Sequence, residues 1–172
     1  MLVFASTVTL KTGTRRSCSF QQLRGLSKLV KATLFHNPNC SKSRAALELL
    51  QTEGKAIAEK NDAILGVVVR EYMTDVPCTD TLANIQRCLG KAPKNWIRKT
   101  PENVYEESGV EEVLHDDEKV LQKMSEYPAL IERPILLLEG DSIFHTAVIG
   151  RPPSAILDEL RETFETTHCG QF

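Results

Sequence analysis

Short runs rich in apolar residues predict the strands of this chain. The runs lie at residues 32–35, 64–72, 135–138 and 143–149. Val67, Val68 and Val69 follow one another without a polar residue, which predicts that the second strand is buried. The last two runs flank the residues Glu-Gly-Asp-Ser at 139–142, and this turn-rich connection predicts a β-hairpin.

Stripes of apolar residues with a helical period predict the helices. These helices are expected at residues 41–53, at 79–89, at 116–127 and after the pair Pro152 and Pro153. Gly54 is expected to end the first of them. Residues 55–62 show no clear period, and residues 94–109 predict irregular structure or short helical turns.

The predicted order is β-α-β-α, a helical segment, and then β-β-α. A βαβ unit followed by a hairpin and a helix is the plan of an α/β protein with a thioredoxin-like fold. It implies a mixed sheet with helices on both faces. The helical segment is an insertion between the βαβ half and the C-terminal ββα half. We expect this domain to span residues 32–165, with a C-terminal tail at 166–172.

Charge is distributed unevenly along the 172 residues, whose formal net charge is −2. No acidic residue precedes Glu48, although eight lysines and arginines do. Leu23, Leu26 and Val30 form one stripe of a basic amphipathic helix. Residues 1–31 are therefore predicted to be a transit peptide for a mitochondrion or plastid. The alternative is a disordered basic tail on a cytoplasmic protein. No apolar run approaches 18 residues, so we expect no stable membrane insertion.

Cysteine usage points to thiol chemistry in a reducing compartment. The five cysteines are an odd number at irregular spacing, which does not predict a disulfide framework. Cys40 lies in the segment HNPNCSKSR, between a predicted strand and a predicted helix. Unpaired N–H groups and the dipole at a helix start stabilise a thiolate and can bind an oxyanion, and Lys42 and Arg44 add positive charge.

The cysteine stands in a C-x-x-S sequence, because Ser43 occupies the position where a dithiol protein would have its second cysteine. An intermediate on Cys40 must therefore be released by another thiol. That thiol could come from outside the chain. Cys169, in the C-terminal tail, is the candidate within it.

Four segments in the right order resemble the glutaredoxin-coupled arsenate reductase family, the ArsC family. HNPNCSKSR is similar to its HNP-x-C-x-x-S-R loop, and the segment WIRK at 96–99 to its L-[IL]-R segment. PALIERPI at 128–135 is similar to P-x-L-I-x-R-P-I, and GRPP at 150–153 to the terminal R-P block. The C-S-K-S-R sequence is most similar to a sister branch, since the best-known arsenate reductases have Gly-Thr after the cysteine.

The resemblance implies a role for each matching residue. Cys40 would be the nucleophile, and Arg98, Arg133 and Arg151 would hold the oxyanion. The residues expected to tune the thiolate are His36, Ser43 and Arg44, and Pro134 is the candidate for a cis proline. Guanidinium groups suit this substrate because they bind the oxygens of a tetrahedral anion in pairs.

The function implied is reduction of arsenate to arsenite through a covalent intermediate on Cys40. Glutathione would be a cosubstrate and glutaredoxin a partner, with no metal, no tightly bound cofactor and no nucleic acid, in a monomer. One alternative is a monothiol oxidoreductase that acts on another glutathione-linked substrate. Another is a redox-sensing regulator similar to Spx, although such regulators usually carry C-x-x-C where this chain has Ser43.

Overall fold

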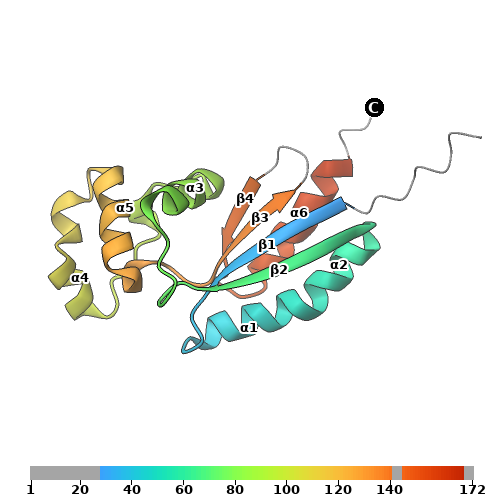
Figure 1. The fold of residues 1–172 in the computed structure, drawn as a ribbon, viewed down its shortest axis with the longest axis horizontal. Coiled ribbons are helices and arrows are strands. Elements are labelled where there is room, and N and C mark those ends of the chain that lie inside the picture. The colour runs from blue at the N-terminus through green and yellow to red at the C-terminus, as the bar shows by residue number, and fades with distance from the viewer. Residues whose placement is uncertain (1–27, 141–144, 169–172) are drawn as a thin grey trace, which may run out of the picture.

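A computed structural model describes residues 28–140 and 145–168 of the chain. Its centre is a four-stranded sheet (Figure 1). The strands are β1 (Lys28–His36), β2 (Ala63–Glu71), β3 (Ile135–Gly140) and β4 (His145–Ile149). They lie in the order β2-β1-β3-β4, with β1 parallel to β2 and the other pairs antiparallel. The predicted mixed sheet, its hairpin and the thioredoxin-like plan are confirmed.

The described part of the chain also has six α-helices. They are α1 (Ser41–Leu49), α2 (Lys55–Lys60), α3 (Thr79–Leu89), α4 (Glu102–Ser108), α5 (Asp117–Glu126) and α6 (Ala155–His168). Short helical turns occur at Pro93–Asn95, Val110–Val113 and Pro128–Leu130. Within residues 28–140 and 145–168, none of the helices has the length and apolar character that a membrane span requires.

Alternate residues of the central strands face two separate cores, because successive side chains of a strand point to opposite faces. Ala32 and Leu34 of β1 pack with α1, α2 and α6 on one face. Phe35 and the buried residues of α3 and α5 pack on the other. Figure 1 shows α3, α4 and α5 gathered at one end of the sheet. They form the predicted helical insertion, and the expected helices on both faces are confirmed.

The prediction that residues 67–69 form a buried strand is wrong. β2 is an edge strand, paired only with β1 in the described structure. Val68 and Val69 are 44% and 40% exposed. Consecutive valines are typical of a strand covered on both faces, but the pattern does not distinguish a central strand from one that lies at an edge.

Gly54 does not end the first helix. The chain passes from α1 through a π-helical turn at Leu50–Gly54 directly into α2, so residues 55–60 are helical. Gly54 is buried, and a Cβ added to it would lie 3.2 Å from Cδ1 of Leu50 and 3.5 Å from Cδ2 of Leu65. The glycine therefore allows the helix to pass close to β2.

The predicted domain boundaries fall inside regular elements. β1 begins at Lys28, so Val30 belongs to this strand and not to an amphipathic helix. Residues 28–31 therefore lie in the sheet, although we assigned them to the N-terminal tail. The last helix begins at Ala155 and extends to His168, past the expected end at residue 165. Residues 1–27 of the segment predicted to be a transit peptide lie outside the described residues, as does Cys169.

We expect Gly150→Ala to lower the free energy of unfolding by about 1–3 kcal/mol. The added Cβ would lie 2.9 Å from Cγ of Pro134 and 3.2 Å from Cγ2 of Ile156. Gly66→Ala is the control, since its Cβ would meet only the Val30 carbonyl oxygen, at 3.9 Å. Urea unfolding followed by circular dichroism measures both variants. Equal stability of the two would contradict the proposed close packing of Gly150.

Candidate active site

Cys40 lies at the start of α1, immediately after the loop that leaves β1. Its N–H donates to the Asn37 carbonyl at 3.0 Å, and its own carbonyl accepts the first helical hydrogen bond, from the Arg44 N–H, also at 3.0 Å. The Asn37 side chain accepts from the Asn39 N–H at 2.9 Å. These bonds form a tight turn that places the sulfur beside the free N–H groups of the first helical turn.

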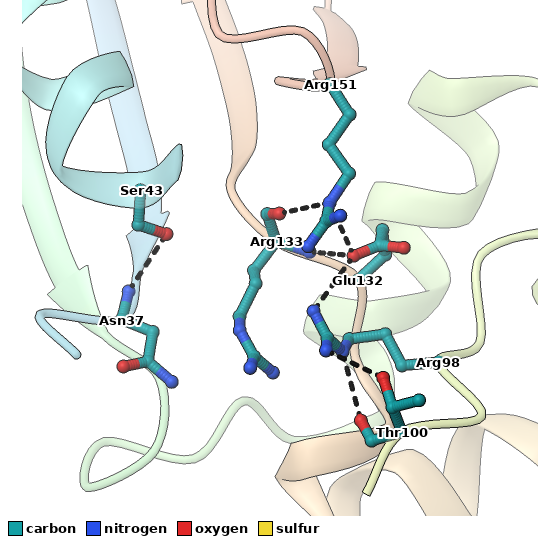
Figure 2. Close-up of polar contacts among 7 residues, drawn as sticks. All are labelled: Asn37, Ser43, Arg98, Thr100, Glu132, Arg133 and Arg151. Atoms are coloured by element: carbon teal, nitrogen blue, oxygen red, sulfur yellow. Dashed lines mark hydrogen bonds and ion pairs between the residues drawn. The ribbon is translucent and has the colours of Figure 1, made fainter. Parts of the chain in front are cut away.

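Ser43 is wholly buried beneath this turn. Its hydroxyl accepts a hydrogen bond from the Asn37 N–H at 3.3 Å (Figure 2). The side chain therefore holds the loop against the helix, while the backbone N–H of Ser43 interacts with Cys40. The two groups of this one residue have separate roles, one in loop geometry and one in thiolate stability.

The pKa of Cys40 is lower than that of an ordinary thiol. Burial raises the pKa of Cys40, but the Ser43 N–H, the Arg133 side chain and the Lys42 N–H lower it by more. Two of these stabilising groups belong to the helix start that the sequence predicted. The third, Arg133, is far away in sequence and comes close through the fold. A larger fraction of Cys40 is therefore a thiolate at neutral pH, which is the nucleophilic form.

His36 and Arg44 are near this loop but have other contacts. Burial lowers the pKa of His36, against the opposing charge of Glu71, which favours the neutral imidazole. Arg44 donates from Nη1 to the Pro38 carbonyl at 2.7 Å, which braces the turn. Neither side chain is among the main groups that lower the pKa of Cys40. Their expected role in tuning the thiolate stays a prediction.

Two hydrogen-bonded segments bring Arg98 beside Arg133. Ile97 and Ile131 form an antiparallel bridge. On either side of it, the Arg98 N–H donates to the Leu130 carbonyl at 2.8 Å and the Glu132 N–H to the Trp96 carbonyl at 3.1 Å. Three residues of the helical insertion are thereby fixed next to the loop that enters β3.

Arg151 reaches the same place from the end of β4. The Gly150 N–H donates to the Pro134 carbonyl at 2.8 Å. Nε of Arg151 then donates to the Arg133 carbonyl at 3.0 Å. The Arg133–Pro134 peptide bond is cis, as the family resemblance implies. The structure thus brings Arg98, Arg133 and Arg151 together, although they lie far apart along the chain (Figure 2).

The three arginines differ in their partners. Arg98 and Arg151 form ion pairs with Glu132, at 3.5 Å and 3.0 Å. Arg98 also donates to the carbonyl and the hydroxyl of Thr100. The guanidinium of Arg133 has no acidic partner within the described residues, and its buried Nε has no acceptor there. Figure 2 shows its guanidinium in the space between Asn37 and Arg98.

Tyr72 completes the site and was missed in the sequence. It is fully buried immediately after β2, and its hydroxyl has no hydrogen-bond partner of good geometry among the described residues. Burial raises the pKa of Tyr72, while the nearby charge of Arg133 opposes the rise. The sequence could have indicated Tyr72, because it directly follows β2. The C-terminal ends of the parallel strands β1 and β2 lie at one edge of the sheet, so Tyr72 lies at the same edge as the loop that follows β1.

Glu132 was also missed, although it lies next to Arg133 in the sequence. Its position is unspecified in the motif that carries the resemblance, so the motif draws no attention to it. The other cysteines in the described structure, Cys78 and Cys88, are free thiols on α3 or at its start. No cluster of three or more histidine, cysteine or acidic side chains suited to a metal occurs within the described ranges.

Arg133→Gln should raise the pKa of Cys40, because it removes the positive charge that faces the sulfur. Arg98→Gln should raise it less, since Arg98 is already bound to Thr100 and Glu132. The rate of Cys40 alkylation by iodoacetamide, measured against pH, gives the pKa of each variant. The other four cysteines, Cys18, Cys78, Cys88 and Cys169, are replaced by serine to isolate the signal. Equal shifts in the two variants would show that Arg133 has no special contact with the thiolate.

Comparison with known proteins agrees with the fold. The ArsC family model matches residues 35–158. An arsenate reductase of Neisseria meningitidis serogroup A is 34% identical over 119 residues, which are 69% of this chain and 89% of that protein. A putative arsenate reductase from Yersinia pestis has a solved structure with a TM-score of 0.58 and 31% identity, covering 74% of this chain and 98% of that one.

The solved arsenate reductase of Vibrio cholerae has a TM-score of 0.60 at 28% identity and covers 76% of this chain and 98% of its own. The matched residues include the loop around Cys40 and all three arginines. A family match over most of the chain, with two similar structures, settles the classification. The protein belongs to the ArsC family.

Proposed function

We propose that this protein is a thiol-dependent oxidoreductase that reduces arsenate to arsenite, with glutathione as cosubstrate and glutaredoxin as partner. One observation carries the proposal. A cysteine with a lowered pKa lies at a helix start, and the arginine that lowers it has no acidic partner in the described structure. The relatives named as arsenate reductases support the choice of arsenate as the oxyanion.

Arg133 is the main substrate-binding residue in this proposal. Its buried Nε and the buried hydroxyl of Tyr72 are donors without acceptors of good geometry in the described protein. Such donors are costly to leave unpaired, so an oxyanion that accepts from them binds favourably. Arg98 and Arg151 lie on the same side of the site and add positive charge. The helix start of α1 supplies further N–H groups.

The first step is attack of the Cys40 thiolate on arsenic. A sulfur–arsenic bond forms, an arsenic–oxygen bond breaks, and the oxygen leaves as hydroxide or, once protonated, as water. Glutathione then replaces a second oxygen in the same way. Arsenic is still in the +5 state at this stage, because substitution transfers no electrons.

Reduction requires a further thiol. A glutaredoxin thiolate attacks the sulfur of the arsenic-bound glutathione, so a disulfide forms between them. The electron pair of the sulfur–arsenic bond stays on arsenic, which becomes +3. Water then releases arsenite and returns Cys40 to the thiolate. In this proposal the electrons come from outside the C-x-x-S sequence, because the hydroxyl of Ser43 cannot form a disulfide with Cys40.

A coupled assay tests the proposed function. The protein is supplied with glutathione, glutaredoxin, glutathione reductase and NADPH, and arsenate is the variable. We expect NADPH oxidation that depends on arsenate and yields one arsenite per NADPH. No NADPH oxidation with arsenate, together with oxidation that depends on this protein when glutaredoxin is omitted and a glutathione mixed disulfide is supplied, would instead support the monothiol oxidoreductase with another substrate.

A further inference from the structure

The carboxylate of Glu132 occupies the middle of the arginine cluster. A single oxygen, Oε1, accepts from the Arg133 N–H at 2.9 Å and lies 3.0 Å from Nε of Arg151. The same oxygen is 3.5 Å from Nη1 of Arg98. The Glu132 side chain is 22% exposed, so its negative charge is held close to the site and is partly shielded from solvent.

This carboxylate changes the charge that an incoming anion meets. The three guanidinium groups and the Glu132 carboxylate together carry a net charge of +2. The negative charge of the Cys40 thiolate reduces this to +1. A singly charged oxyanion would neutralise this remaining positive charge. A doubly charged oxyanion would leave the site with a net negative charge, which is unfavourable in a partly buried place.

We infer that Glu132 is a specificity-determining residue, which sets the site to accept singly charged tetrahedral oxyanions in preference to doubly charged ones. The inference rests on the proposed binding of an oxyanion beside Cys40, but it does not require that arsenate be reduced. Arsenate exists near neutral pH in both charge states. The singly charged form carries one more proton on oxygen, which makes that oxygen a better leaving group.

Two variants of Glu132 distinguish a role in anion specificity from a purely structural role. In Glu132→Gln the amide oxygen can still accept from the Arg133 N–H and from Nη1 of Arg98, while the negative charge that pairs with Arg151 is lost. Glu132→Asp keeps the charge and shortens the side chain. If charge is the function, the glutamine variant changes the preference between anions and the aspartate variant keeps it.

The test uses sulfate and perrhenate, two tetrahedral anions that differ in charge. Each is titrated as a protectant of Cys40 against iodoacetamide, at constant ionic strength and at a pH where the thiol is ionised. Cys18, Cys78, Cys88 and Cys169 are again serine. We expect wild type to bind perrhenate at least as tightly as sulfate. Glu132→Gln should improve sulfate binding about tenfold more than perrhenate binding, since the interaction scales with the anion charge.

Glu139→Gln is the matched control, because this carboxylate pairs with Lys31 at 2.8 Å at the far end of β3. It should leave the ratio of the two binding constants as in wild type. An unchanged ratio in Glu132→Gln, or tighter sulfate binding by wild type, would overturn the inference while the oxyanion site stands. Failure of both anions to protect wild-type Cys40 would overturn the inference together with the proposed oxyanion site.

Discussion

Cys40→Ser is expected to lower arsenate-dependent turnover by at least about a thousandfold, because the proposed covalent intermediate cannot form on a serine hydroxyl. The thiol pKa of Cys40 is lowered by its surroundings, whereas a hydroxyl stays protonated in the same place. The fold should be retained, since the substitution changes one atom in a half-buried side chain. The coupled assay measures the effect, and circular dichroism confirms folding.

Cys78→Ser is a closely matched control for this experiment. Cys78 also precedes a helix, and contact with the hydroxyl and N–H of Thr81 lowers its pKa. It is exposed and has no arginine among the groups that shift it. We expect Cys78→Ser to keep wild-type turnover. Loss of activity in Cys78→Ser, with activity retained in Cys40→Ser, would contradict this account, because it would assign the chemistry to Cys78 at the start of α3.

Arg133→Gln is expected to lower kcat/KM for arsenate about a hundredfold, which corresponds to about 2.7 kcal/mol of transition-state stabilisation. The reason is the loss of the guanidinium that has no acidic partner in the described structure. The same change also raises the pKa of Cys40, which by itself lowers activity near neutral pH.

Two effects of Arg133 can be separated by pH. At a pH where Cys40 is ionised in wild type and variant, the difference in thiolate content disappears. The loss that remains measures substrate binding and transition-state contact. Arg161→Gln, which removes an exposed arginine paired with Asp158 on α6, is the control and should have wild-type kinetics. Full recovery of kcat/KM by Arg133→Gln at high pH would limit Arg133 to tuning the thiol.

Local features of the sequence predicted the chemistry around Cys40. A strand, a polar loop and a helix follow one another without a gap, so the position of the cysteine at a helix start could be inferred from residues 33–50 alone. The apolar stripe of the last helix was equally informative, and Ile156, Leu157, Leu160 and Phe164 are all buried. Such features depend on period and on short-range hydrogen bonding, which the sequence records directly.

Features that depend on tertiary pairing could not be predicted. Glu132 meets Arg98 only because residues 96–98 pair with 130–132, and no local pattern marks that pairing. The three arginines were expected to be equivalent, but they differ in their partners. Arg98 and Arg151 pair with Glu132, whereas the guanidinium of Arg133 has no acidic partner in the described structure. The exposure of Val68 has the same origin, because it follows from the place of β2 at the edge of the sheet.

The most direct measurement is the mass of the protein quenched during turnover with arsenate, glutathione and limiting glutaredoxin. We predict a fraction of the protein with arsenic and glutathione attached, and peptide mapping should place both on Cys40. The adduct should be absent when arsenate is omitted and in Cys40→Ser. Arsenite production without any arsenic on Cys40, or with arsenic on Cys78 in its place, would contradict a covalent intermediate at this site.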